Sequence, residues 1–521
     1  MADEPTTLAA LIEAQGKALG EKPFLHFQDR VISFAELDRR VNRAAHWLAG
    51  LGVKPGVGVS IMMPNAPEWL FVYFATQRLG AYAVPVNVGL KGEGLRHVVD
   101  HSDSSVLVCH PDYVEAIQGI SGSLPKLEQI VVDTEEAPED WKPPEGWQTL
   151  AELMQAPDTN PEVKIEEGAI SVLLYTSGTT GPPKGVVSRY EAMAARGAPM
   201  LGVVLGPGDV LYTCLPLFHA NALFLTTVRA LAMGLPLALS RRFSASRFWD
   251  EVRRYGATTF NALGAMIPIL MKQPERPDDS DNPVRVVLSA ACPASVWEKF
   301  EKRFALQIVE GYGAVDGGGF STINTGDAPK GSIGKPQSPI RIVDDEGADV
   351  PPGEPGELLF QVDDATLRRV EYYKNEEASD AKIRDGWLHT GDLVYADEGG
   401  HLYFADRKTD SLRRRGENIS SWEVERGIDR HPAVLESAVF GVPSDLGEDE
   451  VMAAVVLQEG ETLPPEDLIR HCEEQMARFM VPRYIEFRDA LPKTGTHRIQ
   501  KSVLKREGVG PDTWDRESQQ S

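Results

Sequence analysis

Residues 169–185, AISVLLYTSGTTGPPKG, join a short apolar run to a loop rich in Gly, Ser, Thr and Pro. The usual phosphate-binding loop, G-x-x-x-x-G-K-[ST], has a glycine directly before its lysine and Ser or Thr directly after it. Here Pro183 and Gly185 stand on either side of Lys184. Because proline lacks an N–H and fixes φ near roughly −65°, the spacing predicts a stiff turn rather than a helix start.

The loop has the chemistry of a phosphate cradle all the same. Its hydroxyl groups and its backbone N–H groups can surround polyphosphate oxygens, and Lys184 adds a point charge on a long stem. An ordinary surface loop of Gly, Ser and Thr is the alternative. The stretch therefore indicates an anion-binding loop of an unusual type.

The segment 33–52 predicts a helix. It opens with Ser33 and Glu36 in capping-box spacing and places apolar residues at helical intervals. Glycines at 50 and 52 mark its end.

Apolar runs and helical patterns alternate along the first 300 residues. A strand-like run at 57–63 precedes a helix-like stretch at 67–81 and another apolar run at 82–88, and similar runs return at 169–175 and 284–290. The order strand, helix, strand predicts parallel pairing in an α/β layer.

The sequence pattern changes twice in the second half of the chain. From about residue 331, short runs broken by Gly, Pro and Asp predict a β-rich module, and after DRKTD (406–410) a new α+β rhythm begins. We therefore expect an α/β protein with a large N-terminal domain over 1–406, including a β-rich subdomain at about 331–406. A small C-terminal α+β domain over 407–521 follows, with the boundary near Arg407.

Composition narrows the class of protein. The chain has 521 residues, and 53 basic against 77 acidic residues give a net charge of −24, which argues against nucleic acid or an anionic membrane as the main partner. Its four cysteines form no C-x-x-C pair, so no disulfide framework or zinc site is expected. The N-terminus lacks a signal pattern and no apolar run is long enough to span a bilayer, which predicts a cytoplasmic protein.

The stretch YTSGTTGPPKG resembles the signature loop of the adenylate-forming enzymes, the superfamily of acyl-CoA synthetases, peptide-synthetase adenylation domains and luciferases. Further motifs of that family follow in order across nearly the whole chain: LPLFHANAL (215–223), EGYGAVDGG (310–318), GWLHTGDL (386–393), DRKTD and RRRGENIS (413–420). PLFHANA and FNALGAMIPILMKQP (260–274) are most similar to the carnitine and crotonobetaine CoA ligase branch.

The resemblance implies a role for each matching residue. The signature loop would hold the β- and γ-phosphates of ATP, the GYG turn would face adenine, and an aspartate and an arginine would bind the ribose. The implied cofactor-binding residues are Thr176, Ser177, Gly178, Thr179, Thr180, Gly181, Lys184, Ala290, Ala291, Gly311, Tyr312, Gly313, Val315, Asp392, Arg407, Arg415 and Gly416. The implied Mg²⁺ ligands are Thr176 and Asp316.

The resemblance also places the acyl pocket and the path of coenzyme A. His219 would lie beside both, and the pocket would be lined by His219, Asn221, Phe260, Asn261, Gly264 and Cys292. Arg413, Arg414 and Arg415 offer charges that could neutralise CoA phosphates, although a run of charges is as often a solvated face.

Three departures from the family pattern stand out. The GYG turn usually continues Met-Thr-Glu, but Ala314, Val315 and Asp316 follow here, so the metal carboxylate has a shorter stem and the threonine hydroxyl is lost. Thr409 occupies the hinge position, which is normally Asp or Lys.

The third departure concerns the catalytic lysine. The family motif P-K-T-x-x-G-K-I-x-K reads PKTGTHRIQK (492–501) in this chain, with His497 and Arg498 at the Gly-Lys positions. Arginine keeps the charge but not the geometry of a lysine. Arg498, Lys501 and His219 are therefore the candidate catalytic residues, and the choice between Arg498 and Lys501 stays open.

The implied activity is that of an ATP-dependent acyl-CoA ligase, with ATP, Mg²⁺ and coenzyme A as cofactors and a small carboxylic acid as substrate; a homodimer is left open. The C-terminal domain would swing between adenylation and thioester formation. Transfer to a carrier protein and a degenerate nucleotide-binding protein remain as alternatives. A lyase or oxidoreductase is weaker, because no G-x-G-x-x-G follows a strand.

Overall fold

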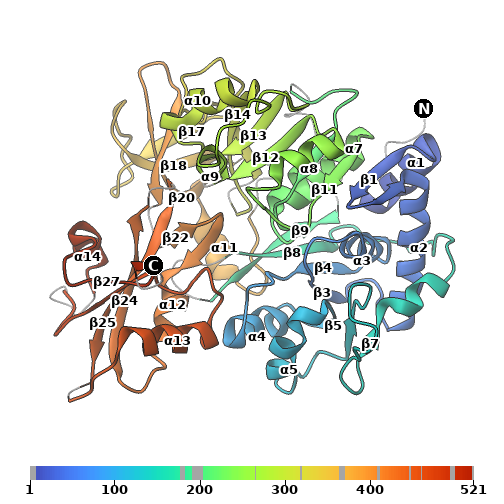
Figure 1. The fold of residues 1–521 in the computed structure, drawn as a ribbon, viewed down its shortest axis with the longest axis horizontal. Helices are drawn as coiled ribbons and strands as arrows, with labels where there is room; N and C mark the ends of the chain where they lie inside the picture. Colours follow the sequence, from blue (N-terminus) through green and yellow to red (C-terminus); the bar gives the residue numbers. More distant parts are fainter. Residues whose placement is uncertain are drawn as a thin grey trace.

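The computed structural model describes residues 7–176, 182–190, 204–263, 266–316, 319–362, 370–407, 411–444, 447–458, 460–492 and 499–518. Two large sheets with helices around them form the body of the molecule, and a smaller α+β part lies beside it (Figure 1). No helix in the described ranges is both long and apolar enough to cross a membrane.

A seven-stranded sheet carries the start of the signature loop. Its strand order is β7-β6-β5-β3-β4-β8-β9, and its pairs are parallel except for the hairpin of β8 and β9. The strands are β3 (Gly58–Met62), β4 (Tyr82–Pro85), β5 (Ser104–Cys109), β6 (Gln129–Val132), β7 (Gln148–Thr149), β8 (Ile170–Thr176) and β9 (Lys184–Arg189). The helical segments between them are α3 (Pro67–Arg78), α4 (Gly92–His101), η1 (Pro111–Tyr113), α5 (Val114–Ser121) and η2 (Leu150–Gln155). The predicted strand–helix–strand unit at 57–88 is confirmed with parallel pairing.

A nine-stranded sheet runs in the order β16-β15-β14-β13-β12-β10-β11-β1-β2. Its strands are β1 (Pro23–Phe27), β2 (Arg30–Ser33), β10 (Leu211–Thr213), β11 (Leu237–Leu239), β12 (Thr259–Leu263), β13 (Val286–Ala290), β14 (Gln307–Ala314), β15 (Gly319–Asn324) and β16 (Lys335–Pro336). The helices that accompany it are α1 (Leu8–Leu19), α2 (Phe34–Gly50), a π-helix (Asn221–Val228), α7 (Arg229–Met233), α8 (Phe248–Tyr255), α9 (Met266–Met271) and α10 (Ala294–Phe304). One continuous apolar core contains residues of both large sheets and of α3, in which every residue except Glu68 is buried.

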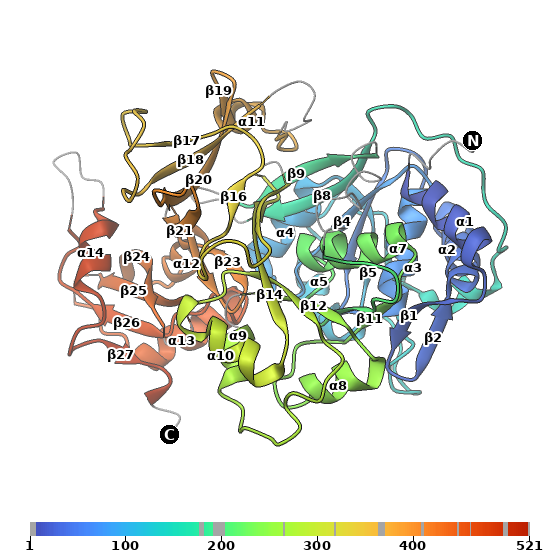
Figure 2. The ribbon, with the colours of Figure 1, turned by 90° about the horizontal axis from the view of Figure 1, so that it is seen from above.

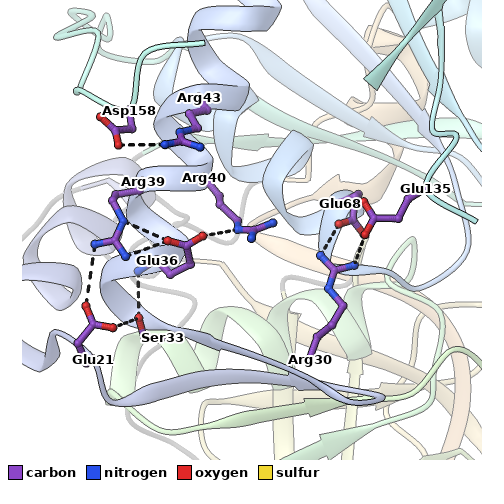
Figure 3. Close-up of polar contacts among 10 residues, drawn as sticks. All are labelled: Glu21, Arg30, Ser33, Glu36, Arg39, Arg40, Arg43, Glu68, Glu135 and Asp158. Carbon is purple, nitrogen blue, oxygen red and sulfur yellow. Dashed lines mark hydrogen bonds and ion pairs between the residues drawn. The ribbon is translucent and has the colours of Figure 1, made fainter. Parts of the chain in front are cut away.

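The N-terminus of α2 confirms the predicted cap. Ser33 Oγ accepts a hydrogen bond from the Glu36 backbone N–H at 3.1 Å (Figure 3). The Glu36 carboxylate does not return to the Ser33 backbone as a full capping box would; instead it pairs with Arg39 and Arg40 at 2.8 and 2.6 Å. Two arginines of the same helix thus bind the Glu36 carboxylate, which in a full capping box would accept the Ser33 backbone N–H.

The β-rich module is a five-stranded antiparallel sheet, which lies to one side of the large sheets in Figure 2. Its elements are β17 (Ile340–Val343), β18 (Gly356–Gln361), α11 (Glu376–Lys382), β19 (Ile383–Arg384), β20 (Trp387–Ala396) and β21 (Leu402–Arg407). The expected β-rich module is thus present, and its bounds at about 331–406 stay a prediction.

The C-terminal part has apolar cores of its own. Its elements are β22 (Ser411–Arg414), β23 (Glu417–Ser420), α12 (Ser421–Ile428), β24 (Val434–Pro443), β25 (Asp449–Leu457), α13 (Pro465–Gln475), β26 (Tyr484–Phe487), α14 (Lys501–Glu507) and β27 (Trp514–Asp515). Helix α13 lies beside α4 of the large part (Figure 1), where Lys91 Nζ donates to the Glu473 carbonyl at 3.4 Å. A domain boundary near Arg407, between β21 and β22, stays a prediction.

Candidate functional site

The signature loop joins two antiparallel strands. Thr176 at the end of β8 pairs with Lys184 at the start of β9, so the loop closes a hairpin and does not open a helix, as its prolines predict. The predicted phosphate contacts Ser177, Gly178, Thr179, Thr180 and Gly181 lie outside the described residues.

A tyrosine joins Lys184 to the expected metal ligand. Lys184 Nζ lies 5.2 Å from the ring centroid of Tyr372, and the Tyr372 hydroxyl donates to Asp316 Oδ2 at 2.8 Å. Burial, followed by the charge of Asp316, raises the pKa of Tyr372, so this hydroxyl stays protonated and remains a donor. The predicted phosphate and metal residues are thus brought together through a residue that sequence reasoning missed.

The donor set around Asp316 fits a magnesium ion that is held mainly by phosphates. Mg²⁺ in nucleotide sites takes one or two protein carboxylates and completes its shell with phosphates and water. Asp316 supplies one carboxylate, which also lies 3.4 Å from Lys382 Nζ. Among the described residues no group of three or more His, Cys, Asp or Glu side chains could hold a metal without a ligand.

The predicted adenosine residues meet across two sheets. The Tyr312 hydroxyl donates to Asp392 Oδ2 at 2.6 Å, which ties β14 to β20. A β-bulge follows Tyr312, between it and Gly313, and such bulges re-aim side chains beside active sites. Asp392 is paired with Arg407 in the register of β20 and β21, so the backbone places the predicted ribose pair side by side.

A buried glutamate fixes the turn after β13. Ala290 ends that strand, and Ala291 has φ +70°, a left-handed conformation that is costly for a residue with a Cβ. The Glu310 carboxylate accepts the N–H groups of Ala291 and of Cys292 (3.2 Å to Oε2 for the latter). Glu310 is 2% exposed, and this burial raises its pKa to about 7. Burial also raises the pKa of the Cys292 thiol, which disfavours the thiolate form that a nucleophile needs.

His219 lies at the junction with the C-terminal part. Its Nε2 is 3.0 Å from both carboxylate oxygens of Glu417, and Asn87 Nδ2 donates to Glu417 Oε2 at 3.1 Å. A cavity of about 140 Å³ is lined by Thr176, Val315, His219 and Glu417 together. The signature loop, the turn after GYG and the C-terminal segment therefore share one space.

The other predicted acyl-pocket residues lie on neighbouring elements. Asn261 Nδ2 on β12 donates to Asn221 Oδ1 at 2.6 Å, and Asn221 begins the π-helix, a form often found at functional sites. Phe260 is 1% exposed and belongs to the core. Gly264 lies outside the described residues.

The tip of the β22–β23 hairpin is a two-residue turn of Arg415 and Gly416, with φ of +54° and +84°. A Cβ on Gly416 would lie 3.0 Å from Leu263 Cδ1, so the turn packs closely on the large part of the molecule. Both turn residues line a cavity of about 1120 Å³ that also contacts His219, Arg241 and Arg242.

One expectation for the arginine run is corrected. Arg414 does not face a phosphate: its Nε lies 2.6 Å from Glu450 Oε2, and its Nη1 donates to the carbonyls of Phe479 and Val481 at 3.2 and 3.0 Å. Alternation along β22 points this side chain inward, where it is buried, while Arg415 at the turn keeps 58% of its side chain exposed.

Of the candidate catalytic cations, Lys501 is described and Arg498 is not, and Gly495, His497 and Thr409 also lie outside the described residues. Lys501 Nζ lies 2.7 Å from Glu425 Oε1 and 2.7 Å from Ser421 Oγ, so in this arrangement it joins α14 to α12. Only the backbone of Arg407 is described here.

Sequence reasoning missed Asn87, Tyr372, Glu310 and Glu417. Two of them had a signal: Glu310 directly precedes the GYG turn, and Glu417 directly follows Gly416 in RRRGENIS. Asn87 and Tyr372 had none, because their roles arise only when distant segments meet.

Comparisons with known proteins agree with this geometry. The chain matches the AMP-binding enzyme family over residues 12–365 and the AMP-binding enzyme C-terminal domain over 423–498. It is 33% identical over 506 residues to a crotonobetaine/carnitine–CoA ligase of Salmonella paratyphi C (strain RKS4594), covering 93% of this chain and 96% of that protein.

Two solved structures are similar over nearly the whole chain. The anthranilate CoA ligase AuaEII in complex with anthranoyl-AMP is 29% identical with a TM-score of 0.72, covering 97% of this chain and 98% of that one. The o-succinylbenzoate CoA synthetase MenE from Bacillus subtilis, a double mutant bound with its product analogue OSB-NCoA, is 26% identical with a TM-score of 0.80, covering 96% and 98%.

Proposed function

The chain belongs to the AMP-binding enzyme family of AMP-forming acid–thiol ligases, and from this premise we propose that it activates a carboxylic acid as acyl-AMP and transfers the acyl group to coenzyme A. In the first step a carboxylate oxygen attacks the α-phosphorus of ATP, and the bond between the α- and β-phosphates breaks to release pyrophosphate. In the second step the CoA sulfur attacks the acyl carbon, AMP leaves with the carboxyl oxygen, and the thiol proton is released.

One observation carries this proposal. The contacts from Lys184 through Tyr372 to Asp316, and the bond from Tyr312 to Asp392, support one nucleotide region, and Thr176 and Val315 line the small cavity beside His219. In this region the protein would act by positioning and by neutralising charge. Magnesium, held by Thr176, Asp316 and the phosphates, would supply charge neutralisation to the leaving pyrophosphate.

The pose of the C-terminal part fits the second step. The Arg415–Gly416 turn and Glu417 lie against Leu263 and His219, where the pantetheine arm is expected. The chain also superposes better on the MenE complex with a CoA product analogue than on the anthranoyl-AMP complex of AuaEII, although its identity to MenE is lower. We infer that a different pose brings Arg498 to the carboxylate for the first step.

Coenzyme A would enter through the cavity of about 1120 Å³. Its lining includes the exposed side chains of Arg242, Arg247 and Arg415, which offer positive charge on a strongly acidic protein. His219 and Glu417 also line this cavity, where the thiol end of the arm is expected.

The function is tested by mixing the protein with MgATP and a panel of carboxylic acids, crotonobetaine and carnitine first among them, with and without CoA. We expect pyrophosphate release with at least one acid and thioester formation when CoA is present. Release without any thioester would favour transfer to a carrier protein, and absence of release with every acid would contradict the proposal.

The catalytic cation is tested in the same assay. We expect Arg498→Ala to lower the rate of pyrophosphate release by about 100- to 1000-fold, because a preorganised charge is lost, whereas Lys501→Ala keeps most of it. The ion pair of Lys501 with Glu425 is the reason for this expectation. If Lys501→Ala abolishes release and Arg498→Ala does not, the assignment to Arg498 is wrong.

A further inference from the structure

Two histidines on helix α4 hold both ends of the signature loop. His97 and His101 are four residues apart on the same face, and their rings stack with centroids 5.1 Å apart and planes at 26°. His97 Nε2 lies 3.0 Å from the Pro183 carbonyl oxygen, and His101 Nδ1 lies 2.8 Å from the Tyr175 hydroxyl. Because a carbonyl only accepts, His97 must carry its proton on Nε2 and donate.

The two residues they contact are next to the predicted phosphate ligands. Tyr175 directly precedes Thr176, and Pro183 directly precedes Lys184. The Tyr175 ring also packs against Gly185 across the hairpin, where an added Cβ would lie 3.1 Å from the ring. A shift of either histidine would therefore be passed to Thr176 or to Lys184 through a single residue.

A second layer braces His101. The Tyr373 ring meets its imidazole edge-on at 5.9 Å, and Lys374 Nζ donates to the His101 carbonyl at 3.2 Å. Burial alone would raise the pKa of Asp103, but hydrogen bonds from Lys126, Lys374 and Tyr373 lower it to about 2. These contacts of Asp103 join the end of α4 to the segment that contains Tyr372. Tyr372 itself contacts Lys184 and Asp316.

The imidazole that contacts Tyr175 favours its neutral form. Burial, then the neighbouring charges of His97 and Lys374, lower the pKa of His101, while Asp103 and Asp100 oppose them. Burial also raises the pKa of Tyr175. The hydrogen bond between His101 Nδ1 and the Tyr175 hydroxyl therefore joins two neutral groups, either of which can be the donor.

We propose that His97 and His101 are positioning residues that set where Thr176 and Lys184 meet the β- and γ-phosphates of ATP, without touching the substrate themselves. This inference rests on the proposed function. If the two histidines only held α4 against the sheet, their loss would weaken the binding of all nucleotides alike.

The test compares MgATP with AMP, because AMP lacks the two phosphates that the loop would hold. Binding of each nucleotide to the full chain is measured by calorimetry, which needs no knowledge of the acid. We expect His97→Ala to weaken MgATP binding by about 3- to 10-fold, the worth of one hydrogen bond, and to leave AMP binding within about twofold. His97→Gln, which retains a donor, is expected to restore most of the MgATP affinity.

A matched control is His46→Ala on α2. His46 Nε2 also lies 2.9 Å from a backbone carbonyl, that of Thr159, but far from the loop in the fold, and neither affinity should change. Tyr175→Phe removes only the hydroxyl bonded to His101 and carries the test should His97→Ala fail to fold.

Equal losses for MgATP and AMP, or no loss for either, would overturn the inference while leaving the proposed function intact. Failure of the unaltered chain to bind either nucleotide would instead contradict the proposed function and the inference with it.

Discussion

The proposed nucleotide region and the proposed acceptor region of this protein are built in different ways. Around the nucleotide, Lys184, Tyr372 and Asp316, and then Tyr312 and Asp392, are joined by contacts within the large part of the chain. On the acceptor side, the contacts of Glu417 with His219 and Asn87 cross from the C-terminal part to the large part. The first set of contacts needs only the large part of the chain, and the second set needs both parts together.

This difference predicts that the two proposed chemical steps can be separated. Damage to the nucleotide region should affect everything that depends on ATP, whereas damage to the acceptor region should affect only what happens after the acyl-AMP has formed. Mutations on the two sides can therefore be told apart by assaying each half-reaction.

The largest expected effect lies in the nucleotide region. We predict that Asp392→Ala lowers the rate of acyl-AMP formation by about 100- to 1000-fold, because Tyr312 loses its acceptor and the ribose loses its predicted carboxylate. Pyrophosphate release measures this rate. The control is Asp397→Asn, which removes a carboxylate from the turn between β20 and β21, where it pairs with His401. Similar rates for the two variants would place the nucleotide elsewhere.

A smaller and more selective effect is expected on the acceptor side. Glu417→Ala should slow transfer from preformed acyl-AMP to CoA by about 10- to 100-fold, because the junction loses its contacts with His219 and Asn87. Pyrophosphate release should change by less than about threefold. Glu474→Ala, on the exposed face of α13, is the matched control. An equal loss of rate in both half-reactions would contradict the proposed division between the two regions.

The smallest expected effect concerns stability, at the turn after β13 that Glu310 holds. In the native state the pKa of Glu310 is about 7, above its ordinary value of 4.5, so the native state binds the proton more tightly than the unfolded state does. Stability contributed by this group is therefore greatest below about pH 4.5 and declines as pH rises to about 7, by at most about 3 kcal/mol. Glu310→Gln should lack this decline.

The measurement for Glu310 is the difference in melting temperature between the unaltered chain and Glu310→Gln across pH 5 to 8. The difference should favour the unaltered chain most at the acid end and level off above pH 7. A difference that is constant with pH would show that Glu310 does not titrate in this range.

Much of the fold could be predicted from local patterns. The periodicity of 33–52 and 67–81 predicted α2 and α3, and the two prolines of the signature loop predicted a turn where the structure has a hairpin. These features succeed because helix spacing and proline stereochemistry act over a few residues.

The site could be predicted only where residues sit in a motif. The separation between Tyr372 and Lys184, or between His97 and Pro183, spans more than 80 residues, and no local pattern marks such pairs. The prediction for Arg414 was wrong for a related reason. In a run of three arginines, only the strand register decides which side chain turns inward.

The two-residue turn of Arg415 and Gly416 has a further consequence for how the two poses exchange. Both residues already hold the left-handed conformation that a tight hairpin needs, so meeting the large part demands little additional ordering of the chain. Because that entropic penalty is small, a ligand that binds one proposed pose only slightly better than the other would shift their populations. A tenfold shift requires only about 1.4 kcal/mol of difference in binding free energy between the two poses.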